Sequence, residues 1–107
     1  MNTKVDVEKL EWYADTEYAY TDIGIDYATV YRAGVEAKNK YYEITIYPLK
    51  LINKDADGWD YRITIMKDGE MINEYVAGAE HYDPFKNKNK AKTASIRTLS
   101  EMLEDGE

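Results

Sequence analysis

The middle of the chain alternates between apolar and polar residues with a period of two, which predicts β-strands. In residues 41–47 the alternation places three large apolar side chains on one face: Tyr42, Ile44 and Ile46. The opposite face carries Tyr41, Glu43, Thr45 and Tyr47. Proline has no N–H to donate to a neighbouring strand, so Pro48 limits this strand at its end.

A second alternating segment leads into a tight turn. Residues 61–66 place Tyr61, Ile63 and Ile65 on one face. Asp68 and Gly69 follow, a pair that favours the type I′ turn of a hairpin because both turn positions need a positive φ. Residues 71–77 are then the returning strand. We therefore expect three antiparallel strands between residues 41 and 77.

The C-terminal segment has the spacing of an amphipathic helix. From Asn89 onward, small and apolar residues recur every three or four positions, at Ala91, Ser95, Thr98, Leu99, Met102 and Leu103. Five bases and no acid lie between residues 86 and 97, and the acids come at the end of the segment. Bases near the start of a helix and acids near its end both interact unfavourably with the helix dipole. The irregular loop over residues 78–88 is long, and long loops often carry function.

The N-terminal third of the sequence leaves alternatives open. A capping box at residues 3–6, with apolar residues at Val7, Leu10 and Ala14, is typical of a short helix, while residues 17–21 fit a strand equally well. Residues 29–37 alternate like a strand, and we favour a strand there over a helix at 26–37. The expected fold is a single α+β domain over residues 1–107, with an antiparallel sheet of about four strands and a C-terminal helix packed on one face.

Composition excludes several classes of protein. The 107 residues contain 21 acids against 14 bases, a formal net charge of −7, and no cysteine. Disulfides, thiolate zinc sites and a cysteine nucleophile are therefore excluded. The sequence has neither an apolar run near the length of a membrane span nor a hydrophobic stretch after Met1. We expect no transmembrane segment, no secretory signal and a cytoplasmic location.

The sequence offers little catalytic chemistry. The only serines are Ser95 and Ser100, both in the predicted helix, and His81 is the only imidazole. None of the six glycines falls in a phosphate-binding pattern. Carboxylates are so frequent that pairs of them arise by chance, and none lies beside a histidine or a metal pattern. We therefore expect no enzyme activity, no cofactor, no metal and no small-molecule substrate.

One short motif resembles a calcium-binding loop. Residues 53–60 place oxygen ligands at the first, third and fifth positions and Gly58 at the sixth, as an EF-hand does. The twelfth position, which should supply a bidentate glutamate, is Thr64, and the flanking segments are predicted strands. A polar turn is the favoured interpretation and a weak calcium site the alternative.

The aromatic residues favour a binding surface. The sequence contains eleven tyrosines and two tryptophans but one phenylalanine. Tyr41 and Tyr47 lie on the strand face opposite Tyr42, so some of these rings must be exposed. Tyrosine is enriched at protein interfaces, because its ring gives a large contact area at a small loss of rotamer entropy. The alternative is that tyrosine replaces phenylalanine and leucine in a small polar core.

The acids are concentrated near the N-terminus. Residues 1–27 hold seven acids against two lysines, and a surface of carboxylates attracts a basic, nucleic-acid-binding protein as phosphates do. On a strand, Asp15 and Glu17 would lie about 6.6 Å apart, close to two phosphate steps of one DNA strand at about 3.4 Å each along the axis. The candidate partner-binding residues are Glu8, Glu11, Asp15, Glu17, Tyr18, Tyr20, Asp22 and Asp26. Direct binding of nucleic acid would oppose the net charge.

Two resemblances follow from these residues. A short, acidic, tyrosine-rich and cysteine-free domain resembles the small anti-defence proteins of phages and mobile elements, such as anti-CRISPR and DNA-mimicking antirestriction proteins. That resemblance implies a non-catalytic inhibitor or adaptor that occupies a basic cleft. Residues 58–103, three strands and then a helix with Lys88, Lys90 and Lys92 near its start, resemble a double-stranded-RNA-binding domain instead. This second resemblance implies that the lysines contact phosphates.

Overall fold

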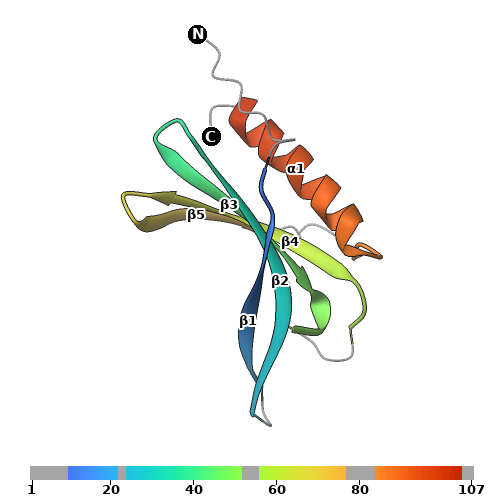
Figure 1. Cartoon of the computed structure of the whole chain (residues 1–107). Helices are drawn as coiled ribbons and strands as arrows, with labels where there is room; N and C mark the ends of the chain where they lie inside the picture. Colours follow the sequence, from blue (N-terminus) through green and yellow to red (C-terminus); the bar gives the residue numbers. More distant parts are fainter. Residues whose placement is uncertain (1–9, 22–23, 52–55, 77–83, 105–107) are drawn as a thin grey trace.

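In the part of the chain that the structure describes, five strands form one antiparallel sheet in the order β1-β2-β3-β4-β5, and an α-helix lies across one of its faces (Figure 1). The computed structural model describes residues 10–21, 24–51, 56–76 and 84–104. The elements are β1 (Tyr13–Thr21), β2 (Gly24–Ala37), β3 (Lys40–Pro48), the short 3₁₀ helix η2 (Leu49–Leu51), β4 (Trp59–Lys67), β5 (Glu70–Val76) and α1 (Lys88–Glu104). The α+β prediction is confirmed, with five strands where about four were expected.

The added strand comes from the N-terminal third, which forms a long hairpin. β1 pairs with β2 over its whole length, from Tyr13 opposite Arg32 to Thr21 opposite Gly24. The preference for a strand over residues 29–37 is confirmed. The helix expected to reach Ala14 is wrong at that residue, because Ala14 lies in β1 and pairs with β2. Backbone pairing with a distant segment outweighs local helix propensity here.

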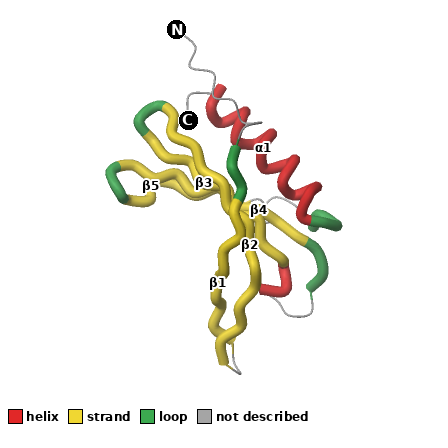
Figure 2. The backbone as a smooth tube through the Cα atoms, viewed as in Figure 1, coloured by secondary structure: helices red, strands yellow, loops and turns green. Residues whose placement is uncertain are grey.

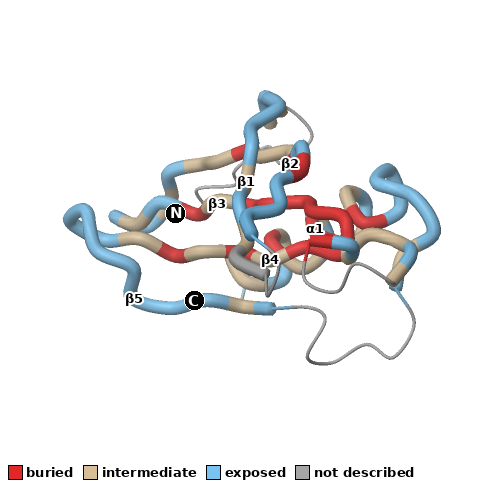
Figure 3. The backbone as a smooth tube through the Cα atoms, turned by 90° about the horizontal axis from the view of Figure 1, so that it is seen from below, coloured by how far each residue is buried: buried red, intermediate tan, exposed pale blue. Residues whose placement is uncertain are grey.

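The main core lies between the sheet and α1, which contacts β3 and β4 (Figure 2). Three small or apolar residues of the helix are fully buried: Ala91, Ser95 and Leu99. They face the predicted inward residues of β3 and β4, which are Tyr42, Ile44, Ile46, Tyr61, Ile63 and Ile65. Both predicted strand faces and the predicted helix face are confirmed. Figure 3 shows these buried segments, with β5 exposed along nearly its whole length.

A smaller cluster lies on the other side of the sheet. Ala28, Val30 and Tyr47 pack with Leu51 of η2, the element that follows β3 directly. Tyr47 is therefore buried, although its place opposite Tyr42 in the sequence pattern made it a candidate for exposure. The expectation of an exposed ring is met by Tyr41 instead.

A glycine positions the segment that precedes α1. Gly58 has a φ of +108°, and a Cβ there would lie 2.9 Å from the Cβ of Pro84 and 3.0 Å from the carbonyl oxygen of Phe85. The next residue, Trp59, exchanges two backbone hydrogen bonds of 2.8 and 2.9 Å with Phe85. The absence of a side chain at Gly58 thus lets residues 84–85 lie against β4.

We expect Gly58→Ala to lower the free energy of unfolding by about 1.5 kcal/mol, because it adds backbone strain and a clash with Pro84. Urea denaturation measures the change. Gly24→Ala is the matched control, since Gly24 also has a positive φ of +136° but nothing within 4 Å of its Cβ position. Equal losses for both variants would contradict the close approach as the cause.

Candidate functional site: the open face of the sheet

The face of the sheet opposite α1, here called the open face, is strongly acidic. Alternate residues of each strand point to it, and the antiparallel register brings these positions side by side. Its strand carboxylates come from all five strands: Asp15, Glu17, Asp26, Glu36, Glu43, Asp60 and Glu74. Only two strand bases share this face, Arg32 and Arg62. The open face therefore concentrates negative charge that the sequence distributes over five strands.

Arg32 of β2 holds three of these carboxylates. Its Nε donates to Asp15 at 2.9 Å and its Nη2 to Glu17 at 3.1 Å. Nη1 donates to the buried Thr45 hydroxyl at 3.0 Å and lies 3.7 Å from a Glu43 oxygen. Each carboxylate comes from a neighbouring strand, so the arginine links β1, β2 and β3 across the open face.

Arg62 of β4 reaches the same network through Glu17. Its two terminal nitrogens each donate to one oxygen of the Glu17 carboxylate at 2.8 Å, a bidentate pair. The guanidinium also lies 5.8 Å from the centre of the Tyr47 ring.

Burial raises the pKa of Glu17, but the hydrogen bonds and charges of Arg62 and Arg32 outweigh burial and hold this pKa below its ordinary value. Burial, followed by the charge of Asp60, raises the pKa of Tyr47 to about 12.

Two exposed tyrosines flank the carboxylates. Tyr13 and Tyr41 both lie beside Glu43, and the pKa of each phenol is raised, first by burial and then by the charge of Glu43. The Tyr41 ring lies over Gly34, where a Cβ would come within 1.9 Å of the phenol oxygen. Glycine thus makes room for the ring on the sheet surface. The open face combines fixed carboxylates with accessible aromatic area.

The β1–β2 hairpin projects beyond the rest of the sheet. β2 pairs with β3 only from Tyr31 onward, so residues 16–21 and 24–29 form a two-stranded extension, here called the ribbon (Figure 1). On the side of the ribbon away from the open face, Tyr18 and Tyr27 lie directly opposite each other, with ring centroids 6.0 Å apart. Their exposed fractions are 64% and 71%.

The structure divides the predicted partner-binding residues between two sides of the sheet. Asp15, Glu17 and Asp26 lie on the open face, and Tyr18 lies on the other side, because successive residues of a strand alternate. Glu11 is exposed in the segment before β1, and the backbone of Tyr20 pairs with that of Ile25. Glu8 and Asp22 lie outside the described residues.

Sequence reasoning missed several residues of the open face: Glu36, Glu43, Glu74, Tyr13 and Tyr41. A signal was present for two of them. The alternation over residues 41–47 already placed Tyr41 and Glu43 away from the core. The net charge of each segment did not single out these acids, because residues 28–85 contain both acids and bases.

The lysines at the start of α1 lie on the helix side of the sheet. The Nζ of Lys88 lies 4.2 Å from the centre of the Tyr31 ring, and the Nζ of Lys92 lies 4.6 Å from the centre of the Trp12 ring. These four residues line a cavity of about 50 Å³. Lys90 is exposed. The sheet has two strands more than the three on which the resemblance to a double-stranded-RNA-binding domain rests.

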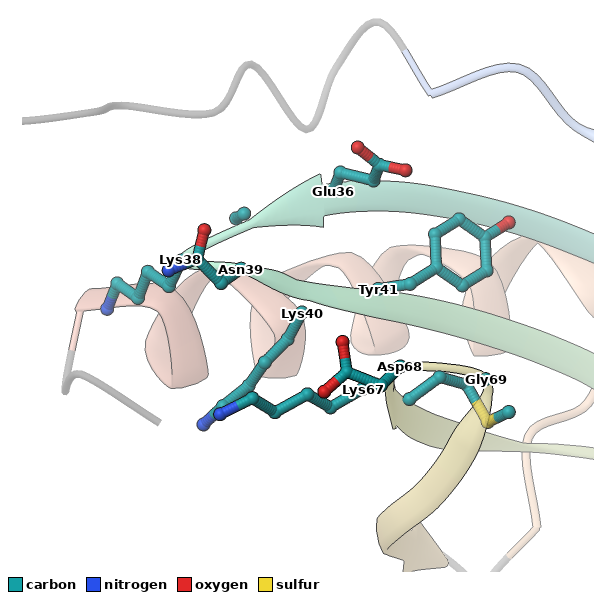
Figure 4. A pocket seen from close by; sticks show the side chains of 10 residues that line it. Glu36, Lys38, Asn39, Lys40, Tyr41, Lys67, Asp68 and Gly69 are labelled. Carbon is teal, nitrogen blue, oxygen red and sulfur yellow. The ribbon is translucent and has the colours of Figure 1, made fainter.

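A hollow of about 900 Å³ lies between the tips of the β2–β3 and β4–β5 hairpins. Figure 4 shows Lys40 and Lys67 extending in the same direction, away from Tyr41. The Nζ of Lys38, which also lines the hollow, donates to the carbonyl oxygen of Leu103 at the end of α1. The lining mixes lysines with Glu36 and Asp68 and holds no serine or histidine.

The structure describes both serines and part of the calcium-like motif. Ser95 is buried and donates to the Lys92 carbonyl oxygen at 2.7 Å. No group of three or more His, Asp or Glu side chains within the described ranges is placed to hold a metal ion. Asn53 and Asp55 of the calcium-like motif, together with His81, lie outside those ranges.

Among the residues that the structure describes, no helix is long and apolar enough to cross a membrane. Comparisons with known protein families, curated protein sequences and solved structures give no match to this chain.

Proposed function

We propose that this protein is a non-catalytic inhibitor or adaptor whose open face docks on a basic, nucleic-acid-binding protein, in the manner of a DNA mimic. The observation that carries the proposal is the gathering of seven strand carboxylates, six of them at least partly exposed and Asp60 buried, against two arginines on one face of the sheet. A concentrated field of one sign steers a partner of opposite charge and favours its basic cleft.

The sheet supplies a regular and rigid lattice for these charges. Neighbouring strands lie about 4.8 Å apart, and alternate residues of one strand advance about 6.6 Å. Asp15 and Glu17 have this second spacing on β1, on the same face. Their hydrogen bonds to Arg32 hold the carboxylates in place before any partner arrives, which reduces the entropy lost on binding.

Three carboxylates of the open face are best placed to meet a partner. Asp26, Glu36 and Glu74 are exposed, and their side chains form no hydrogen bond or ion pair within the described residues. Asp15, Glu17 and Glu43, by contrast, form ion pairs with Arg32 or Arg62. The charge of Glu74 acts on Arg62 without forming an ion pair. Reversing Glu17 would place an ammonium between two arginines and disrupt the fold, so it is unsuited to a binding test.

The test reverses only the exposed acids. We expect Asp26→Lys, Glu36→Lys and Glu74→Lys together to weaken partner binding by about 100-fold, since each lost charge pair contributes on the order of 1 kcal/mol. The matched control, Asp57→Lys, Glu101→Lys and Glu104→Lys, reverses three exposed acids elsewhere and gives the same formal charge. Nuclease-treated pull-down from lysate over a salt series, with mass spectrometry, compares the two variants with the wild type.

The outcomes separate the candidate functions. A stoichiometric, salt-sensitive partner that itself binds nucleic acid, retained by the control and lost by the open-face variant, supports the proposal. Equal retention by both variants contradicts it. If nuclease treatment removes every partner, the lysine-rich start of α1 becomes the binding site, and Lys88→Glu, Lys90→Glu and Lys92→Glu should then abolish binding to nucleic acid.

A further inference from the structure

We propose that the ribbon is a second contact element that recognises arginine side chains of the same partner, through the rings of Tyr18 and Tyr27. This inference rests on the proposed function, since it assigns the chemistry of the partner surface. The ribbon has the charge to attract such a surface: it contains the acids Glu17 and Asp26 and no lysine, arginine or histidine. Glu17 is paired with Arg32 and Arg62, so Asp26 is the ribbon carboxylate that is exposed and forms no ion pair within the described residues.

The two rings are placed as an accessible platform. Tyr18 of β1 and Tyr27 of β2 are directly opposite in the register, and their ring planes are tilted by 50°. With exposed fractions of 64% and 71%, each ring presents a face to solvent. Ile25, on the same side of the ribbon, is 60% exposed. Exposed aromatic and apolar residues grouped on a projecting element are typical of interaction sites.

The chain itself shows how a tyrosine ring and a carboxylate hold an arginine together. The Arg62 guanidinium lies 5.8 Å from the Tyr47 ring centre while it forms the bidentate pair with Glu17. Lys88 and Lys92 similarly lie over the rings of Tyr31 and Trp12.

Within the described residues, no cation of the chain lies over Tyr18 or Tyr27. Their ring faces are therefore available to a cation from another molecule. The acids on the opposite side of the same two strands add attraction for that cation without occupying the ring faces.

Arginine fits this platform better than lysine. A guanidinium is planar and weakly hydrated, so it stacks on a ring and still donates hydrogen bonds in its own plane. An ammonium is compact and strongly hydrated, and it loses more on leaving water. A cation over one exposed aromatic ring strengthens binding by about 2–5-fold, so we expect a preference of several-fold for arginine over lysine when more than one such contact forms.

Titration of the full chain with oligoarginine and oligolysine peptides of equal length, by calorimetry and NMR, tests the inference. We expect oligoarginine to bind about 3–10-fold more tightly. Tyr18→Leu with Tyr27→Leu should weaken oligoarginine more than oligolysine and so reduce this ratio to about one. Tyr18→Phe with Tyr27→Phe is the matched control, because it keeps both aromatic rings and should keep the preference.

The results distinguish failure of this inference from failure of the proposed function. Equal binding of both peptides by the wild type overturns the inference and leaves the acidic open face intact. If neither peptide binds, both proposals fail. As a measurement without mutation, the ring resonances of Tyr18 and Tyr27 should shift more with oligoarginine, and equal shifts would overturn the assignment. Self-association that the Tyr18 and Tyr27 changes abolish would identify a second copy of the chain as the occupant instead.

Discussion

Replacing Leu99 with alanine is expected to lower the free energy of unfolding by about 3 kcal/mol. Leu99 is fully buried at the centre of the helix face that packs on the sheet, among side chains such as Ile44 and Ile63. Truncation removes apolar contacts and leaves a cavity that the surrounding strands, paired on both sides, close only in part. Since small domains have about 5–15 kcal/mol of stability, this is a large fraction.

Urea denaturation, followed by circular dichroism, measures the effect. Ile96→Ala is the matched control, because Ile96 lies in the same helix, has a side chain of similar size and is only half-buried. Ile96→Ala should lower the free energy of unfolding by about 1 kcal/mol or less. A Leu99→Ala variant as stable as the control would contradict the packing of α1 on the sheet.

Replacing Glu17 with glutamine is expected to destabilise the protein by about 2 kcal/mol at neutral pH. Glutamine keeps the size of the side chain but removes the charge that Arg32 and Arg62 share. Three hydrogen bonds from guanidinium groups are then weakened or lost in a half-buried site, which leaves two arginines without their common partner.

Glu17→Gln should also change how the free energy of unfolding depends on pH. The pKa of Glu17 in the folded protein lies below its ordinary value of 4.5, so its charge stabilises the fold fully above about pH 4.5. This contribution is lost as pH falls through the lowered pKa of the folded state. The difference in unfolding free energy between wild type and Glu17→Gln should therefore be largest near pH 7 and shrink in acid.

Denaturation midpoints at several pH values check this expectation. Asp15→Asn is the control: Asp15 also binds Arg32, but its side chain is about half exposed, so its removal should destabilise the fold less. Hydrogen bonds from the Thr16 N–H and from Arg32 lower the pKa of Asp15 as well. A stability difference for Glu17→Gln that stays constant between pH 7 and pH 3 would contradict a role for its charge.

Local signals in the sequence were sufficient for the elements between residues 41 and 76. A period of two identified β3 and β4, and the turn at Asp68 and Gly69 has the positive φ values, 54° and 82°, that its residue types favour. The helix was equally readable, because its small and apolar face has a period close to 3.6 residues.

The N-terminal hairpin was not determined in this way. Residues 13–21 form β1 because β2 supplies partners for their backbone groups, and that pairing joins positions as far apart as Tyr13 and Arg32. Tyr47 is likewise buried only because η2 turns Leu51 back over the sheet. Neither contact leaves a periodic signal in the sequence.

The candidate site shows the same division. The sequence by itself determined the excess of acid and the number of tyrosines, and it predicted a C-terminal helix on one face of the sheet. The separation of Asp15 and Glu17 from Tyr18 on opposite sides came with the pairing of β1 and β2. Only the tertiary structure determined that strand register brings Glu36, Glu43 and Glu74 together on the face opposite α1. The physical reason is that side-chain alternation is a local property of a strand, whereas register and the choice of buried face depend on contacts between distant segments.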